Sequence, residues 1–160
     1  MKRLAETIEA LAGRDQSLVE ESTLVDMLRD QGATALHKLC KDFVDALNIQ
    51  LTQPALVLDP GDWHEDSFND AGSNLLQISL RGRLLQLEFE PTEEPYSSED
   101  FRLPYVLRGG VRSFNQDLLE HDTVDEQQIY FCPSDTGAAW HYFDARTYRS
   151  GVLTEDYLAA

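Results

Sequence analysis

Residues 74–90, NLLQISLRGRLLQLEFE, decide the fold class of this chain. Apolar side chains occupy every second position on both sides of Gly82, which is typical of paired strands that bury one face. We predict a two-residue turn at Gly82-Arg83, with glycine at the first central position of a type II′ turn. In that register Leu80 faces Leu85, and the opposite face carries polar side chains: Gln77, Ser79, Arg81, Gln86 and Glu88.

This hairpin predicts an antiparallel sheet with one face packed on helices and the other in water. The same register pairs Ile78 with Leu87 and Leu76 with Phe89. A slip of one residue would turn these apolar side chains toward water, so the pattern specifies the register strongly.

The first 50 residues have the period of helices. Apolar residues recur at helical spacing before Gly13, which has the position of a C-terminal stop. A second helical stretch is predicted over residues 17–30 and ends at a break around Gly32. The third stretch, residues 35–49, has the clearest apolar stripe, formed by Leu36, Leu39, Cys40, Phe43 and Leu47.

After Pro54 the period changes to alternation, and residues 91–100 are predicted to form a loop. Thr154 can cap a last short helix. We therefore predict an α+β fold as a single domain over residues 1–160. Helices from residues 1–50 pack on an antiparallel sheet of about five strands within 51–160, and a short C-terminal helix closes one edge. The order of elements resembles that of small acidic secretion chaperones and other adaptor domains, which implies a role in protein binding.

The net charge of −16, from 13 basic and 29 acidic residues, bounds the possible partners. A field of this sign repels phosphate backbones and favours a basic protein partner. No run approaches the roughly 20 apolar residues that a membrane span needs. Acidic residues interrupt the apolar part of any signal peptide. We expect a soluble, cytoplasmic protein that binds neither nucleic acid nor membrane, and the sequence leaves its oligomeric state open.

Cys132 and His141 form the first candidate site, a nucleophile with its base. If the loop between their strands has an even number of residues, Cys132 pairs with Ala139 and Tyr130 with His141. The cysteine and the histidine are then diagonal neighbours with Cα atoms about 7–8 Å apart. An odd loop places them on opposite faces. We favour a packed hairpin, with no catalytic residue and no cofactor.

The second candidate is the acidic segment DPGDWHEDSFND, residues 59–70. Its spacing fails the calcium-loop template, which requires glycine at the sixth position and glutamate at the twelfth. A looser metal site would use Asp62, His64 and Asp66, whereas a solvated acidic loop needs no ligand. Trp63 is expected to anchor the segment on the core.

The third candidate is the segment RLPYVLRGGVR, where Arg102, Arg108 and Arg112 flank Gly109-Gly110. Exposed backbone N–H groups beside arginines can hold a phosphate or carboxylate. The phosphate-binding signatures GxxxxGK[ST] and GxGxxG are both absent, and paired glycines in a strand also mark a bulge or turn.

These observations favour a non-enzymatic binding or adaptor domain that uses an acidic surface against a basic partner. Its expected surface includes the loop around Glu93 to Asp100 and the polar sheet face with Gln77, Gln86 and Glu88. The alternative is a small-ligand or anion-binding domain, with or without enzymatic activity, whose site lies near Arg108, Arg112 and residues 59–70. A self-associating structural domain is a third hypothesis, since sheet edges permit it.

Overall fold

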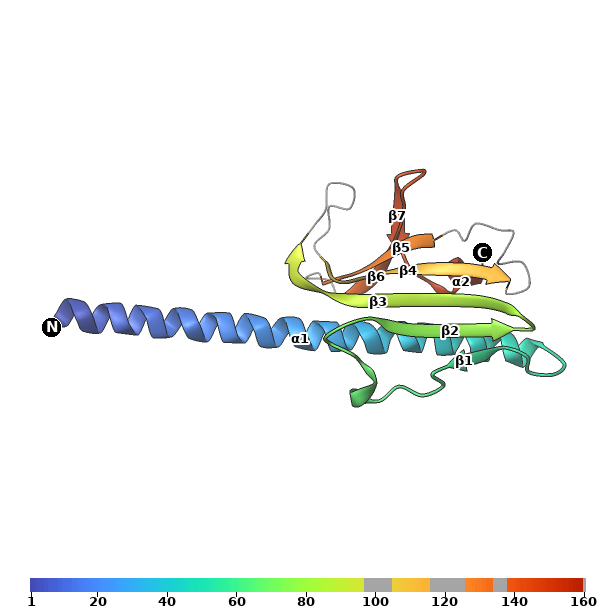
Figure 1. Ribbon diagram of the computed structural model, residues 1–160, viewed down its shortest axis with the longest axis horizontal. Coiled ribbons are helices and arrows are strands. Elements are labelled where there is room, and N and C mark those ends of the chain that lie inside the picture. Colours follow the sequence, from blue (N-terminus) through green and yellow to red (C-terminus); the bar gives the residue numbers. More distant parts are fainter. Residues whose placement is uncertain (97–104, 116–125, 134–137, 160) are drawn as a thin grey trace.

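The structure is a computed structural model of the 160-residue chain. It describes residues 1–96, 105–115, 126–133 and 138–159, and the side chains of these residues except 15–23, 65, 93–96 and 115. The elements in chain order are α1 (Lys2–Gln50), β1 (Val57–Asp59), a 3-10 turn (Glu65–Ser67), β2 (Asn74–Leu80), β3 (Arg83–Tyr96), β4 (Tyr105–Asn115), β5 (Glu126–Cys132), β6 (Ala139–Asp144), β7 (Arg149–Val152) and α2 (Glu155–Ala159) (Figure 1).

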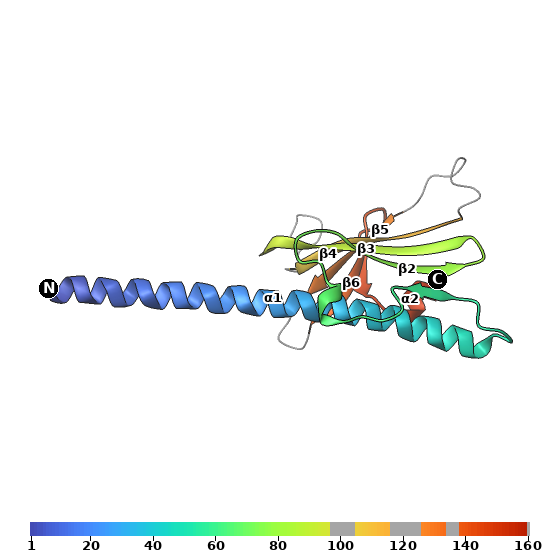
Figure 2. The ribbon, with the colours of Figure 1, turned by 60° about the horizontal axis from the view of Figure 1, so that its bottom comes forward.

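The strands form one antiparallel sheet in the order β1-β2-β3-β4-β5-β6-β7, so each strand pairs with its neighbours in the chain. The C-terminal half of α1 runs along one face of this sheet, and α2 lies on the same side (Figures 1 and 2). We call the face toward α1 the inner face and the opposite one the outer face. The predicted α+β class and the packing of helix on sheet are confirmed, with seven strands in place of about five.

The prediction of separate N-terminal helices is wrong, because residues 2–50 form one continuous helix. Neither Gly13 nor Gly32 adopts the left-handed conformation by which glycine ends a helix. At Gly32 the helix instead packs tightly against the sheet. A Cβ atom there would lie 2.7 Å from side-chain carbons of Leu107 and Phe131, so glycine provides the space for close contact.

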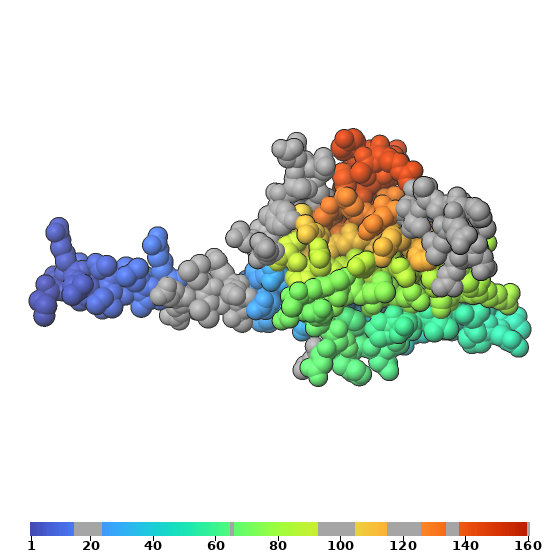
Figure 3. Space-filling view, viewed as in Figure 1, coloured from blue at the N-terminus to red at the C-terminus, as the bar shows by residue number. Residues whose placement is uncertain are grey.

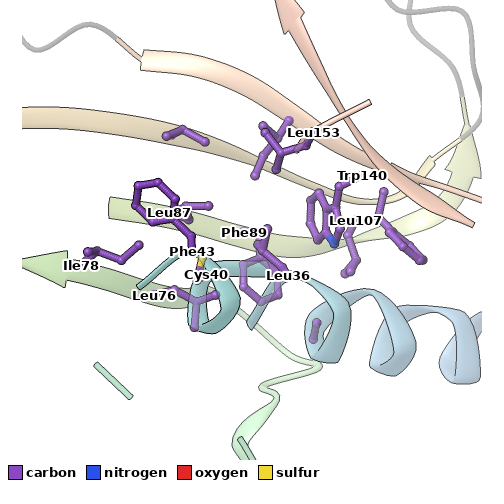
Figure 4. Packing of buried hydrophobic residues seen from close by; sticks show 14 of the residues in the cluster. Leu36, Cys40, Phe43, Leu76, Ile78, Leu87, Phe89, Leu107, Trp140 and Leu153 are labelled. Carbon is purple, nitrogen blue, oxygen red and sulfur yellow. The ribbon is translucent and has the colours of Figure 1, made fainter. Parts of the chain in front are cut away.

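The core lies between α1 and the inner face of the sheet (Figure 4). The predicted helical stripe is confirmed, since Leu36, Cys40 and Phe43 are buried against the strands. Trp140 on β6 donates its indole N–H to the carbonyl of Gly32, at 2.7 Å. This bond joins β6 to the part of α1 that packs against the sheet.

The N-terminal part of α1 extends beyond the sheet (Figures 1 and 3). Residues 1–14 are exposed throughout, and the apolar side chains of Leu4, Ile8 and Leu11 are each more than half exposed. Among the described residues, neither helix combines the length and the apolar composition needed to cross a membrane.

The C-terminal end of α1 is tied to the sheet by one side chain. The Oδ1 atom of Asn48 accepts hydrogen bonds from the backbone N–H groups of Ala55 and Leu56, both at 3.0 Å. Its Nδ2 atom donates to the carbonyl of Leu56, also at 3.0 Å. Asn48 thus satisfies the backbone polar groups of a segment that has no strand partner of its own.

The β2–β3 hairpin forms as predicted, but the predicted turn is one residue too late. The two turn residues are Arg81 and Gly82, with φ values of 47° and 82°. Positive φ at both positions is the type I′ geometry, in which glycine favours the second position. The pairing therefore shifts by two residues, with Ile78 opposite Leu85, and every side chain stays on its predicted face.

The predictions of a loop after β3 and of a cap for α2 have different outcomes. The predicted loop over residues 91–100 is wrong for residues 91–96, which extend β3; residues 97–100 lie outside the described part of the chain. A register irregularity between Pro91 and Tyr96 accommodates prolines that cannot donate ladder hydrogen bonds. The predicted cap of α2 is confirmed, because the backbone N–H of Tyr157 donates to Thr154 Oγ1 at 3.3 Å.

Candidate functional site

The outer face of the sheet gathers two sets of residues that the sequence presents as separate candidates. Gln77, Gln86 and Arg112 are aligned across β2, β3 and β4, and Glu126 of β5 completes this row. In the next two rows of the same face, Glu88 lies opposite Gly110 and Glu90 lies opposite Arg108. The polar face of the hairpin and the arginines of β4 therefore form one surface. Arg102, the third predicted arginine, lies outside the described residues.

Hydrogen bonds and ion pairs organise this surface. Arg112 Nη2 is 2.7 Å from Glu88 Oε2, and Arg108 Nη2 is 3.0 Å from Glu90 Oε1. Ser73 Oγ donates to the other oxygen of Glu88, at 2.6 Å. All four charged side chains are between 30% and 50% exposed, so each pair adds only about 0–1 kcal/mol of stability. Their main effect is to fix the positions of the charges.

A groove of about 590 Å³ lies over the centre of this face. Gly109 and Gly110 both line it, and Gly110, which faces outward, has no side chain to fill it. The carboxylate of Glu126 occupies the space directly above Gly110, where a Cβ atom would overlap it. Among the described residues, Glu126 has no hydrogen bond and no ion pair. Within the described part of the chain, the groove thus contains a carboxylate that forms no ion pair, although Arg112 is its register partner and bonds to Glu88 instead.

Aromatic side chains border the groove on the side of β4 and β5. The rings of Tyr105 and Tyr130 have centroids 4.4 Å apart, inclined at 43°. The hydroxyl of Tyr130 donates to the side-chain oxygen of Gln128 at 2.9 Å. Both rings line the groove beside its carboxylates, an arrangement that suits a cation because a ring face attracts positive charge.

The charges of the groove favour a cation over an anion. Glu88, Glu90 and Glu126 line it, and Arg108 is the one basic residue among its described lining residues. Arg108 donates to Glu90, and Arg112 beside the groove donates to Glu88. An anion would have to displace a carboxylate from each guanidinium. The Nε atom of Arg112 has no acceptor among the described residues, but it is buried beneath the surface.

Of the acidic segment of residues 59–70, the exposed Asp59 lies on this surface, because it is the register partner of Gln77. The segment then turns to the inner side. Trp63 packs against the core cluster and stacks on His37 of α1, with ring centroids 5.5 Å apart. The Nε2 atom of His37 is 2.8 Å from the carbonyl oxygen of Pro60, which fixes the segment on the inner side. The predicted anchoring role of Trp63 is confirmed. Pro60 and Trp63 of this segment therefore lie on the opposite side of the sheet from Arg108 and Arg112.

The three residues predicted as metal ligands, Asp62, His64 and Asp66, are all exposed. His64 engages Ser67 in a reciprocal capping interaction at the 3-10 turn, where its backbone N–H donates to Ser67 Oγ at 2.9 Å. Within the described part of the chain, no group of three or more His, Cys, Asp or Glu residues is placed to hold a metal ion. A metal site in this segment stays a prediction.

Cys132 and His141 have the arrangement predicted for an even number of loop residues between their strands. Cys132 pairs with Ala139 and Tyr130 with His141, so the cysteine and the histidine are diagonal neighbours on the outer face. The thiol of Cys132 donates to the Tyr130 carbonyl at 3.8 Å, and Nδ1 of His141 is 3.1 Å from the Ala139 carbonyl. Burial raises the pKa of Cys132 to about 12, so its thiol is not ionised at neutral pH. An un-ionised thiol is a poor nucleophile.

The residues that sequence reasoning missed are those that line the groove beside the predicted ones: Ser73, Glu90, Tyr105, Glu126, Gln128 and Tyr130. In a strand, every second side chain lies on the same face. Glu126, Gln128 and Tyr130 would therefore have been placed on one face if β5 had been predicted to begin at Glu126. No family model, no curated protein and no solved structure was found to match this chain.

Proposed function

We propose that this chain is a non-enzymatic binding domain that receives a basic segment of a partner protein in the groove over Gly110. The carboxylate of Glu126 carries the proposal. It lies in the groove without a neutralising partner among the described residues. A lysine ammonium or an arginine guanidinium entering there would make a charge-assisted hydrogen bond, which is about twice as strong as a neutral one.

The surroundings of Glu126 support the same class of partner. Glu88 and Glu90 line the groove on the side of β3, and the rings of Tyr105 and Tyr130 line it on the other. Because Gly110 has no side chain, the Glu126 carboxylate lies within the groove, where a long basic side chain can reach it. The net charge of −16 adds a long-range field that attracts basic segments and speeds their association.

Titration with an octalysine peptide tests this proposal. Glu126→Gln removes one carboxylate from the groove, and Glu155→Gln removes one from the exposed N-terminus of α2. Both variants change the net charge of the chain equally. We expect Glu126→Gln to weaken octalysine binding about three- to tenfold, and Glu155→Gln to weaken it less than about twofold at physiological ionic strength. Isothermal titration calorimetry measures both affinities.

An equal effect of the two substitutions would contradict the proposal, because it would show that only the net charge matters. Wild-type protein that fails to bind octalysine even at low salt would also contradict it. Raising the salt concentration should weaken wild-type binding strongly, since charges further apart than about 8 Å are screened at physiological ionic strength.

A further inference from the structure

A second hollow, distinct from the groove over Gly110, lies on the inner face of the sheet. It has a volume of about 580 Å³ and is bounded by strands β3 to β7 on one side and by α2 on the other. Its size falls in the range of about 300–1,000 Å³ that small-molecule sites occupy. We call it the inner groove.

The composition of the inner face changes at the inner groove. Along β4, β5 and β6 the inward positions that α1 covers are apolar or glycine, as at Leu107, Ile129 and Trp140. At the end of the sheet near the β2–β3 turn, the next inward position of each strand is polar. These positions are Ser113, Gln127 and Asp144.

The polar groups of the inner groove have unused hydrogen-bonding capacity. Among the described residues, the side chains of Ser113 and Gln127 have no hydrogen-bond partner, and neither do the hydroxyls of Tyr142 and Tyr157. Ser113 is exposed and Gln127 is half-buried, so water can reach both side chains, and the polar groups of a ligand can take the place of that water. This end of the inner face is therefore accessible to a ligand.

The rest of the lining is apolar or aromatic. Leu85 and Val111 form part of the sheet side, and Leu158 comes from α2. The rings of Tyr142 and Tyr157 stack with centroids 4.4 Å apart and an angle of 15° between their planes, which joins α2 to the sheet. An apolar body of a ligand can therefore contact hydrocarbon and ring surfaces while its polar end reaches Ser113 and Gln127.

The charges at the rim of the inner groove balance one another. Asp144 on β6 and Arg149 on β7 are register partners, so the rim carries one negative and one positive charge. The Asp144 carboxylate already accepts a hydrogen bond from the backbone N–H of Arg146, at 2.9 Å. A lining without net charge gives no preference to an anion or a cation.

We propose that the inner groove binds a neutral small molecule with an apolar ring and a hydrogen-bonding head group. The ring lies against Leu85 and Val111, and the head group exchanges hydrogen bonds with Ser113 and Gln127. This site is independent of the groove over Gly110, which lies on the other face of the sheet.

Saturation-transfer NMR with benzamide tests the proposal, with benzoate and benzylamine as probes of equal size and opposite charge. Benzamide has the neutral ring and the amide head group that the lining requires. We expect it to bind the wild-type protein with a Kd of about 1–10 mM, as is usual for so small a ligand. The two charged probes should bind at least about fivefold more weakly, because the lining has no net charge to offset the loss of their hydration.

Two variants on neighbouring positions of β5 locate the site. Gln127 faces the inner groove, whereas Gln128 faces outward and lines the groove over Gly110. Gln127→Leu should weaken benzamide binding at least about fivefold, since it removes the amide that pairs with the head group. Gln128→Leu should leave benzamide binding unchanged. If Gln127→Leu lowers the Tm, Ser113→Ala provides a second test, because it is a smaller change in the same groove and should also weaken benzamide binding.

Three results would overturn the proposal: no saturation transfer to benzamide, equal binding by wild type and both inner-face variants, or tighter binding of either charged probe. Octalysine binding by Gln127→Leu should equal that of the wild type. Failure of the inner groove and failure of the proposed basic-segment site are therefore distinguishable.

Discussion

Gly32→Ala lowers the free energy of unfolding by about 1–3 kcal/mol, the usual cost of extra volume in a packed core. The added methyl group would lie 2.7 Å from side-chain carbons of both Leu107 and Phe131, so the helix must move away from the sheet. That movement also stretches the hydrogen bond from Trp140 to the Gly32 carbonyl. Urea denaturation followed by circular dichroism measures the effect.

Gly13→Ala is the matched control in the same helix. No atom outside the helix lies within 4 Å of a Cβ at this position. Alanine there should strengthen the local helix by up to about 1 kcal/mol, which is the difference in intrinsic helix propensity. Two variants that behave alike would contradict the packing of Gly32 against β4 and β5.

Gly109→Ala should destabilise the sheet by a similar amount, about 1–3 kcal/mol. A Cβ atom at this position would overlap the backbone carbonyl oxygen of Glu88 and lie 2.9 Å from the Cα of Phe89. Backbone cannot swing aside as a side chain can, so β3 and β4 would have to separate locally. The Tm measured by differential scanning calorimetry reports the loss.

Gly110→Ala, one residue further, should change stability by less than about 0.5 kcal/mol. The three atoms nearest to its methyl group would all belong to the side chain of Glu126, which is exposed and free to rotate away. The same rotation takes the carboxylate out of the groove, so octalysine binding should weaken. A large loss of stability in Gly110→Ala, or none in Gly109→Ala, would contradict the assignment of these glycines to opposite faces.

Much of the fold could be predicted because its strongest signals are local. The alternation in residues 74–90 predicts the hairpin and its faces, and the stripe from Leu36 to Leu47 predicts the helix that covers them. The turn was displaced by one residue because Arg81 adopts a positive φ, which is uncommon outside glycine. β7 was missed because its four residues are short and mostly exposed, and so carry no apolar alternation.

The glycines of α1 show where local reasoning fails. Gly13 and Gly32 look alike in the sequence, and both suggest the end of a helix. Their roles depend on what packs across from them, which is open space for Gly13 and the side chains of β4 and β5 for Gly32. Such contacts join residues far apart in the chain, so no local pattern contains them.

The candidate site was predictable in its parts and not as a whole. Alternation placed Gln77, Gln86 and Glu88 on a polar face, and the composition of β4 singled out Arg108 and Arg112. Their union depends on the order β2-β3-β4-β5 across the sheet, which the sequence does not state. Glu126 was missed because β5 begins with the polar run Glu-Gln-Gln, where no apolar residue marks the start of the strand.

The tyrosines offer the most direct measurement of the central claim, that the outer groove receives a basic segment. Tyr105 and Tyr130 line that groove, whereas Tyr142 and Tyr157 line the inner one. Ring ¹H–¹³C NMR spectra recorded during an octalysine titration should show shifts of the Tyr105 and Tyr130 resonances, with those of Tyr142 and Tyr157 unchanged. Shifts confined to Tyr142 and Tyr157, or no shift at any of the four rings on binding, would contradict the claim.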